Sequence, residues 1–373
     1  MSFQISRDSS LPLHIQLLDE LRHLIKAGRL RAHDRLPGEW ELVEQLGISR
    51  ATIQKAWQSA EQEELIYRVA GKGTFVAETT RPASGRTTVG FFIPEYRGTF
   101  AVEMLSGAER VLREHGYAVH FANTDRDIDE ENRLLRDVIN NGGRGCILVP
   151  VRSDTQQRVL GSGELNVPVV LMDRPINGLI LPCVSSNNYA GALQAMQHLI
   201  DLGHRRIHFV ARPHMDLWPV AERYRAYQDA LHRVGAEPAP PFLIGGETEM
   251  SSYEAYLHDN DEEIQPLMAF LQGEDAPTAI FAVNDWMAIK VQRAIQLIGL
   301  NNPQDISVIG FDDLDIAQYQ NPPLTTIAQN ANLMGAEAAR RLITLMEGEE
   351  SNEIITLLPT KLVLRSSTAP HAN

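Results

Sequence analysis

Apolar residues along the first eighty positions follow the spacing of short helices and then of a hairpin. In the helical stretches they recur every three or four residues, and Pro12 and Ser49 stand at two of the expected starts. Gly47 separates the second and third stretches and permits a tight turn. The pattern predicts helices over residues 11–28, 39–46 and 50–61 and strands over residues 65–69 and 74–77, with a glycine-containing tip between the strands.

Beyond residue 88 the pattern changes to buried strands that alternate with amphipathic helices. Such alternation favours parallel sheets covered by helices on both faces, and two successive series predict two similar subdomains with a ligand crevice at the carboxyl ends of the strands. The predicted strands are residues 89–94, 118–123, 145–150, 167–172, 183–186, 207–211, 242–244, 279–283 and 308–311. The predicted helices are residues 101–114, 130–140, 189–202, 221–234, 252–271 and 286–298.

The two patterns meet at a polar, turn-rich stretch without periodicity. The N-terminal order of helix, short turn, helix and hairpin is that of a winged helix-turn-helix, in which the second helix of the motif enters a major groove and the wing reaches the backbone or minor groove. We therefore predict a small α+β winged helix-turn-helix domain at residues 1–78, a linker at 79–88 and a two-lobed α/β ligand-binding domain at 89–373.

Charge changes this picture only when its distribution is considered. The 373 residues are 43% hydrophobic and 22% charged, which suits two or three globular domains, and the net charge of −14 by itself argues against nucleic acid. Residues 1–80, however, carry ten basic against eleven acidic residues, whereas the remainder carries 24 against 37. The N-terminal bases also cluster, and local positive charge is what a phosphate-facing surface requires.

The remaining composition suggests a cytoplasmic protein. The two cysteines, Cys146 and Cys183, lie in strand-like apolar runs, which fits a reducing compartment without disulfides. We find no secretion signal and no stretch apolar enough to span a bilayer. The twelve histidines lack metal-ligand spacing, so we expect neither a metal site nor a cofactor.

Four short motifs resemble the DNA-binding domain of the GntR family over about residues 3–78. They are PLHIQ at residues 12–16, RLPGE at 35–39, GISRATI at 47–53 and GKGTFV at 71–76. The resemblance implies DNA contacts from these motifs and from the helix that follows the turn. The implied positions are Arg35, Glu39, Ser49, Arg50, Thr52, Gln54, Lys55, Gly71 and Lys72.

The chemistry of these side chains suggests separate roles. Arginine suits guanine and glutamine suits adenine, so Arg50 and Gln54 are expected to read base edges. The side chains of Arg35, Thr52, Lys55 and Lys72 are expected to hold phosphates, although Lys72 alone could equally be a solvated loop lysine. The family often has serine in place of Gly38 and arginine in place of Trp40, and these departures remove possible polar contacts.

The rest of the chain resembles the LacI/GalR effector domain, a periplasmic-binding-protein-like fold. The resemblance runs from about residue 87 to residues 365–368. The motifs that carry it are VGFFIP at residues 89–94, GHRRI at 203–207, AVND at 282–285, DISVIGFDD at 305–313 and PPLTT at 322–326. The combination of the two domains resembles arabinose-repressor-like transcription regulators, which implies a ligand-responsive DNA-binding protein without identifying its sugar.

In that family the ligand lies between two lobes joined by three crossings, expected here near residues 185–188, 311–313 and 326–329. The ligand-contacting positions map onto Phe100, Asn187, Arg223, Asn284, Asp312 and Gln329. Aromatic side chains cover the apolar face of a sugar ring, and besides Phe100 the candidates for this role are Tyr96, Trp218 and Trp286.

Each of these residues also has a structural interpretation. Asp312 would cap a following helix, Arg223 would pair with Glu222, and Asn284 would be an N-cap. For Trp286 a core position is favoured over ligand contact. The family commonly has aspartate where this chain has Asn187, which removes one acceptor.

We therefore expect a homodimeric transcription regulator, a repressor, that binds double-stranded operator DNA and a small effector, a mono- or disaccharide. Residues 332–346 carry apolar positions but end without a heptad repeat, so dimer and tetramer both stay open. A ligand-binding protein without a transcriptional role and a sugar-processing enzyme are the alternatives. Sequence-specific footprinting would exclude the first, and product formation from sugars would support the second.

Overall fold

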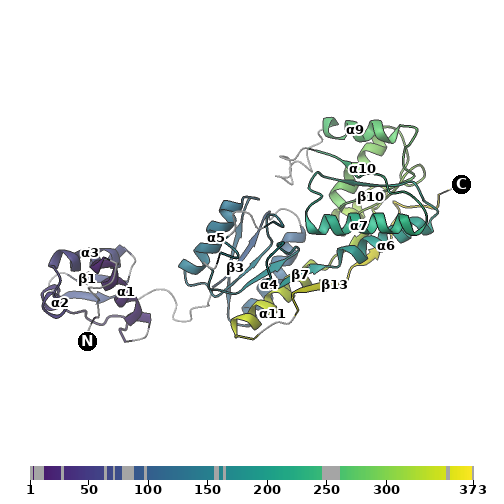
Figure 1. The fold of residues 1–373 in the computed structure, drawn as a ribbon. Coiled ribbons are helices and arrows are strands. Elements are labelled where there is room, and N and C mark those ends of the chain that lie inside the picture. Colours follow the sequence, from purple (N-terminus) through teal and green to yellow (C-terminus); the bar gives the residue numbers. More distant parts are fainter. Residues whose placement is uncertain are drawn as a thin grey trace. The chain divides into compact units, whose positions relative to one another are not determined.

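A computed structural model describes residue 3 and residues 12–26, 29–62, 65–69, 72–77, 88–95, 99–154, 159–162, 165–245, 261–349 and 353–371. The chain divides into two compact units, Met1–Gly85 and Arg86–Asn373, and each is described by itself (Figure 1). The described elements reproduce the alternation that the hydrophobic pattern predicts, with most ends within about three residues of expectation.

In its described residues, the N-terminal unit has three helices and a two-stranded hairpin around one core. The apolar face of each helix points inward, and Trp57, Ile53 and Ala60 of the third helix are fully buried there with Leu17 and Leu21 of the first. The hairpin strands pair antiparallel. The elements are α1 (Leu13–Lys26), α2 (Glu39–Leu46), α3 (Arg50–Gln62), β1 (Ile66–Val69) and β2 (Gly73–Val76).

The second unit begins with a lobe built on a six-stranded, all-parallel sheet in the order β13-β7-β6-β5-β3-β4. Phe91 faces helices α4 and α11, whereas Phe92 faces the side of α5, so that both sheet faces are buried. The elements of this first lobe are β3 (Thr88–Ile93), α4 (Thr99–Glu114), β4 (Ala118–Asn123), α5 (Ile128–Asn140), β5 (Cys146–Leu148), β6 (Val169–Met172), β7 (Cys183–Ser186), α11 (Ala331–Met346) and β13 (Ile355–Leu358).

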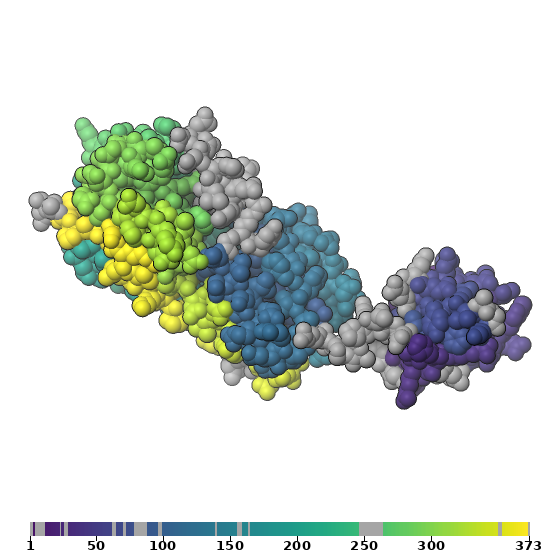
Figure 2. Space-filling model, turned by 180° about the vertical axis from the view of Figure 1, so that it is seen from behind, coloured from purple at the N-terminus to yellow at the C-terminus, as the bar shows by residue number. Residues whose placement is uncertain are grey.

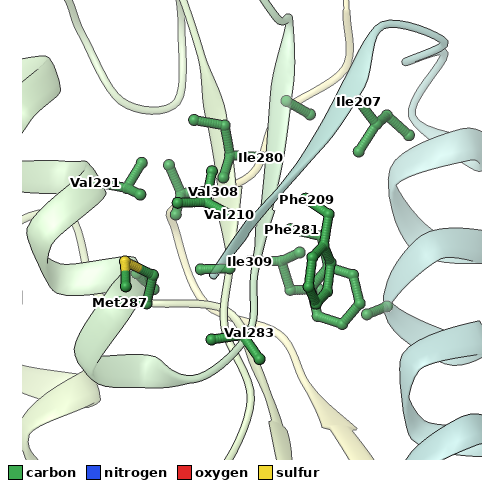
Figure 3. Close-up of a cluster of buried hydrophobic side chains, with 14 of the residues drawn as sticks. Ile207, Phe209, Val210, Ile280, Phe281, Val283, Met287, Val291, Val308 and Ile309 are labelled. Atoms are coloured by element: carbon green, nitrogen blue, oxygen red, sulfur yellow. The ribbon is translucent and has the colours of Figure 1, made fainter. Parts of the chain in front are cut away.

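A second lobe carries a four-stranded parallel sheet in the order β11-β10-β8-β9. Phe209 and Phe281 pack edge to face on one side of this sheet, toward α7, and Met287 of α10 lies on the other (Figure 3). The elements are α6 (Asn188–Asp201), β8 (Ile207–Ala211), α7 (Trp218–Arg233), β9 (Phe242–Leu243), α9 (Asp261–Leu271), β10 (Ala279–Ala282), α10 (Asp285–Leu297), β11 (Ser307–Ile309) and the short 3₁₀ helix η2 (Asp315–Tyr319).

Three crossings join the two lobes. The chain crosses from β7 to α6, from β12 (Thr326–Ala328) to α11, and from β13 to β14 (Lys361–Val363), where β12 and β14 pair antiparallel. In the space-filling view the yellow C-terminal segments accordingly lie on both lobes (Figure 2). The expected crossing at residues 311–313 is wrong, because this segment follows β11 within the second lobe and the third crossing lies at residues 359–360.

The apolar positions of residues 332–346, from which dimer and tetramer could not be distinguished, lie on helix α11. Ala336, Ala339, Leu342 and Ile343 are buried against α4 and the first-lobe sheet, so this apolar face serves the lobe's own core. The sequence pattern did not predict β12, β13 or β14, each of which is only three or four residues long. The helix expected at residues 252–271 is present as α9 over Asp261–Leu271, and its first nine positions, 252–260, lie outside the described residues.

Candidate functional site

The turn between α2 and α3 positions the first residues of α3. Gly47 adopts a left-handed conformation with φ of 64°, which glycine tolerates without steric cost. The Ser49 hydroxyl then accepts a hydrogen bond from the backbone N–H of Thr52 at 3.2 Å, as expected of an N-cap. The helix-turn-helix geometry predicted for this segment is therefore present.

Glu39 connects α2 to the exposed residues of α3. Its Oε2 accepts from Nε of Arg50 at 2.7 Å and from Nε2 of Gln54 at 3.1 Å, and Oε1 lies 3.8 Å from a guanidinium nitrogen of Arg68 on β1. Partial burial raises the pKa of Glu39, but the hydrogen bonds from Arg50 and Gln54 outweigh it, so that this pKa lies below its usual value. Glu39 therefore holds the two side chains expected to read bases.

Other predicted DNA contacts lie on α3 and on the wing. Lys55 is exposed and Thr52 half-buried on α3, and Lys72 is exposed in the turn of the hairpin. Arg35 pairs with Phe75 of β2 through an isolated bridge and lies against Gly73, where an added Cβ would approach its Nε to 3.1 Å. Gly71 lies outside the described residues.

In the second unit, two cavities of about 490 and 260 Å³ lie between the lobes, and Phe100 of α4 lines both. The larger one is lined by Asp312 and Gln329, and the smaller one by Asn284 and Trp286. Both are reached from the carboxyl ends of parallel strands, which is where the topology predicts a ligand. The structure thus brings five of the sequence-derived candidates to one cleft.

Arg223 ties three segments together beneath this cleft. Its Nε donates to Oδ1 of Asn188 at 2.9 Å, one terminal nitrogen donates to the carbonyl of Val283 at 2.7 Å, and the other lies 3.5 Å from Oδ1 of Asp312. The guanidinium also lies 3.7 Å from the ring centroid of Phe311. The alternative pairing of Arg223 with Glu222 is wrong, since Arg223 is 6% exposed and turned to Asp312.

Asp312 is unusual in its backbone conformation and in the pKa of its carboxyl group. Its φ is 120°, and its Oδ1 accepts from Nε2 of Gln329 at 2.6 Å, across the second crossing. Burial raises the pKa of Asp312 to about 6, against the opposing effects of Arg223 and of the Gln329 hydrogen bond. Asp312 does not cap η2, whose N-cap residue is Leu314.

Both asparagines among the candidates are helix N-caps. Oδ1 of Asn284 accepts from the N–H of Met287 at 3.0 Å, and Oδ1 of Asn187 accepts from the N–H of Ala190 at 3.0 Å. The structural interpretation of Asn284 is therefore confirmed, and Asn284 also lines the smaller cavity. Capping uses the amide oxygen of each side chain and not its NH₂ group. Asn187 is absent from the described linings of both cavities.

The aromatic candidates separate in the structure. Trp286 is only partly buried and lines the smaller cavity, so the favoured core position was wrong. Trp218 is the first residue of α7 and is absent from the described linings of both cavities. Tyr96 lies outside the described residues.

Four charged residues at the smaller cavity were missed by the sequence analysis. A guanidinium nitrogen of Arg126 lies 2.5 Å from Oε2 of Glu95, and Arg174 lies 3.0 Å from Oδ2 of Asp173. All four lie within three residues of the carboxyl ends of strands β3, β4 and β6. Because ligands bind at the carboxyl ends of parallel strands, this position was the signal that could have identified them.

Left-handed backbone conformations concentrate around the same cleft. Asp125, Arg126, Asp173, Asp312 and Asp313 all have positive φ, and non-glycine residues adopt this region at a cost of about 1–3 kcal/mol each. Strain of this kind persists where the surroundings hold it and often accompanies ligand sites. Four of these residues, Arg126, Asp173, Asp312 and Asp313, line the two cavities.

A second buried carboxylate fixes the loops that frame the cleft. Asp285 accepts hydrogen bonds from the Thr326 hydroxyl at 2.5 Å and from the N–H of Leu314 at 2.8 Å. Burial raises the pKa of Asp285 well above its usual value. Asp285 thereby holds β12 and the start of η2 to the end of β10.

The histidines serve structural contacts where they are buried. His204 hydrogen-bonds Thr278, Ser307 and the carbonyl of Ala369. Among the described residues, no group of three or more His, Cys, Asp or Glu side chains is arranged to hold a metal ion. Within the same part of the chain, no helix has both the length and the apolar character to cross a membrane.

Comparison with known proteins agrees with both units. Residues 14–76 match the model of bacterial regulatory proteins of the gntR family, and residues 196–368 match a periplasmic binding protein-like domain. The arabinose metabolism transcriptional repressor of Geobacillus stearothermophilus is 30% identical over 97% of this chain and 99% of its own length. The chain belongs to the ligand-controlled transcriptional repressors that join a GntR-type domain to a LacI-type effector domain.

Other members of this wider group match the effector half. The ribose operon repressor of Escherichia coli K12 is 31% identical over 69% of this chain and 74% of its own length. A LacI-type regulator from Alkaliphilus metalliredigens, solved with D-xylulofuranose, has a TM-score of 0.62 and 25% identity, covering 76% of this chain and 99% of that one. These relatives are transcriptional regulators rather than enzymes. For a repressor of this family, operator DNA and a small effector are the implied partners.

Proposed function

We propose that this repressor binds its operator as a homodimer in the cytoplasm and that a single five-carbon sugar in the interlobe cleft sets its operator affinity. The observation that carries the proposal is the smaller cavity of about 260 Å³, which both lobes line. It is small for a ligand pocket, which favours a monosaccharide over a disaccharide.

The lining of this cavity suits a neutral polyol. Glu95 and Asp173 supply acceptors, and Arg126 and Arg174 supply donors, in two pairs whose charges balance. Sugar hydroxyls both donate and accept, so such pairs can satisfy several of them at once. Phe100 and Trp286 offer apolar surface for the faces of a sugar ring.

The relatives support the size of the proposed effector. The names of two refer to the five-carbon sugars arabinose and ribose, and a third was solved with D-xylulofuranose. Asn284 would contact the sugar in the smaller cavity, and Asp312 and Gln329 would bind it from the larger cavity, which shares Phe100 with the smaller one. Asn187, Arg223 and Trp218 would act from the edge of the cleft. We expect no catalysis, because the matched relatives are named as transcriptional repressors.

On the DNA side, the proposed contacts are those of α3 and the wing. Arg50 and Gln54 would read base edges, Arg35, Thr52, Lys55 and Lys72 would hold phosphates, and Glu39 and Ser49 would position them. Gly71 stays a proposed DNA contact on the strength of its match to the family's wing motif. Two such domains in a dimer would meet two half-sites of a near-palindromic operator about one helical turn apart.

A thermal-shift screen of five-carbon sugars, six-carbon sugars and disaccharides tests the effector. We expect one or a few five-carbon sugars to raise the melting temperature of the full chain, because a ligand that binds only the folded state stabilises it. The Arg126→Ala variant should lose this shift, and Arg110→Ala, an exposed arginine of α4, should keep it. Stabilisation by disaccharides alone would contradict the proposal.

A further inference from the structure

Trp40 differs from the other three tryptophans of the chain in its exposure. Trp57 is fully buried, and Trp218 and Trp286 are partly buried, whereas Trp40 is 67% exposed on the first turn of α2. Single exposed apolar residues are common on protein surfaces, so exposure alone assigns no role. The neighbours of Trp40 supply the further observation.

The Trp40 ring lies beside the side chain proposed to read a base. The guanidinium carbon of Arg50 is 5.4 Å from the centroid of the indole, within the range of a cation–π contact. Nε of Arg50 is occupied by Glu39 at 2.7 Å, and the same carboxylate oxygen accepts from Gln54. Trp40 therefore flanks the Arg50–Gln54 pair on the exposed side of the helix-turn-helix.

This arrangement orients Arg50. Its Nε edge is held by Glu39, and among the described residues no hydrogen bond to its two terminal nitrogens is found. Those nitrogens are the fork that pairs with O6 and N7 of guanine. A base pair next to that guanine would then lie against the indole.

We propose that Trp40 is itself a base-contacting residue, whose indole packs against the C5-methyl group of a thymine adjacent to the base read by Arg50. The thymine methyl is the apolar feature of the major groove, and an uncharged aromatic face recognises it by contact rather than by hydrogen bonding. The proposal rests on the placement of α3 in the major groove under the proposed function. It adds a preference for one base pair that Arg50 and Gln54 do not read.

The contact would affect sequence preference and leave the salt dependence unchanged. Phosphate contacts release counterions and set the slope of affinity against salt, and an indole carries no charge to contribute to that slope. Trp40 can thus be distinguished from the phosphate-holding lysines in one titration series.

The test uses the full chain and duplexes enriched by that chain from a randomised pool. In the best duplex each thymine is replaced in turn by deoxyuridine, which removes only the methyl group. We expect one replacement to weaken wild-type binding by about five- to tenfold, at the lower end of the range for a lost base contact, and to leave the Trp40→Ala variant unaffected. Lys72→Ala should lower the salt slope by about one, whereas Trp40→Ala should keep it.

Two controls separate the possible outcomes. Glu44→Gln, an exposed change on the same helix, should retain the methyl dependence. Acrylamide quenching of tryptophan fluorescence should fall when duplex is added to the wild type and stay constant for Trp40→Phe.

The proposal is overturned if no thymine replacement distinguishes the wild type from Trp40→Ala, or if Trp40→Ala relaxes only the guanine position. If the pool yields no enriched duplex, the proposed operator-binding function fails instead.

Discussion

At the scale of single residues, the cleft depends on carboxylates that the fold buries or holds in unfavourable backbone conformations. Asp312 has positive φ, lies beside the buried Arg223 and accepts from Gln329 across a crossing between lobes. Gln329 lies in the second crossing. A change in the hydrogen bonding of Asp312 therefore affects the connection between the lobes directly. A sugar hydroxyl that donates to Asp312 would therefore act where the lobes meet.

The raised pKa of Asp312 gives a pH prediction. With a pKa of about 6 in the folded protein, the carboxyl is mostly protonated at pH 5 and mostly ionised at pH 7. If the sugar donates to the ionised form, its affinity should rise with pH through 6 and be about tenfold lower at pH 5 than at pH 7. Calorimetric titration over this range measures the dependence.

The Asp312→Asn variant is the control for this titration. It cannot ionise, so its sugar affinity should be nearly constant between pH 5 and 7. A wild-type affinity that is flat across the range, or a variant that keeps the same slope, would contradict the role given to Asp312. Unfolding curves of both proteins verify that the fold is retained.

At the scale of elements, the first lobe is organised around the close packing of α4 and α11. A Cβ added at Gly107 would lie 1.9 Å from the carbonyl oxygen of Asn332, and one at Gly335 would lie 1.8 Å from that of Met104. The two helices touch backbone to backbone, and α11 starts directly after a crossing. Their spacing therefore fixes where that crossing enters the first lobe.

Gly335→Ala should destabilise this lobe. The methyl group must force α4 and α11 apart, and overpacking of this kind costs about 1–3 kcal/mol of unfolding free energy. Denaturant unfolding of the full chain measures the loss. Gly273→Ala, where the nearest atom would be 3.3 Å away, is the matched control and should change the unfolding free energy much less. Equal stability of Gly335→Ala and the wild type would exclude the close packing described.

At the scale of the whole molecule, DNA binding and sugar binding are proposed for different units. The residues proposed to contact DNA lie within Met1–Gly85, and those that line the cleft lie within Arg86–Asn373. A change in one unit should therefore alter one binding reaction directly. The effect on the other reaction arises only through the coupling between them, which in allosteric proteins is typically about 1–3 kcal/mol.

Two substitutions test this division. Arg50→Ala should lose specific operator binding and keep its sugar affinity, and Asp312→Ala should keep operator binding and lose the response to sugar. Fluorescence anisotropy with a labelled duplex, with and without sugar, measures both, and the wild type should change operator affinity by about 5- to 150-fold. If both variants lost both activities while remaining folded, the separation of roles would be wrong.

The sequence by itself determined much of the fold and named five of the residues that line the cleft. Helical spacing and the Gly47–Ser49 turn are local signals, so the helix-turn-helix could be predicted with its N-cap. Continuous apolar runs, typical of strands buried on both faces, likewise predicted two parallel sheets. Short strands such as β13 have too few residues to show a period, and their pairing partners are distant in the chain.

Only the tertiary structure decided which side chains meet. Arg223 and Asp312 are 89 positions apart, and nothing local indicates that one guanidinium joins Asn188, Val283 and Asp312. The pairs Glu95–Arg126 and Asp173–Arg174 become a binding site because parallel strands bring their carboxyl ends to one edge. Local pattern specifies elements, whereas a site depends on contacts between residues far apart in sequence, which form only when the sheets assemble.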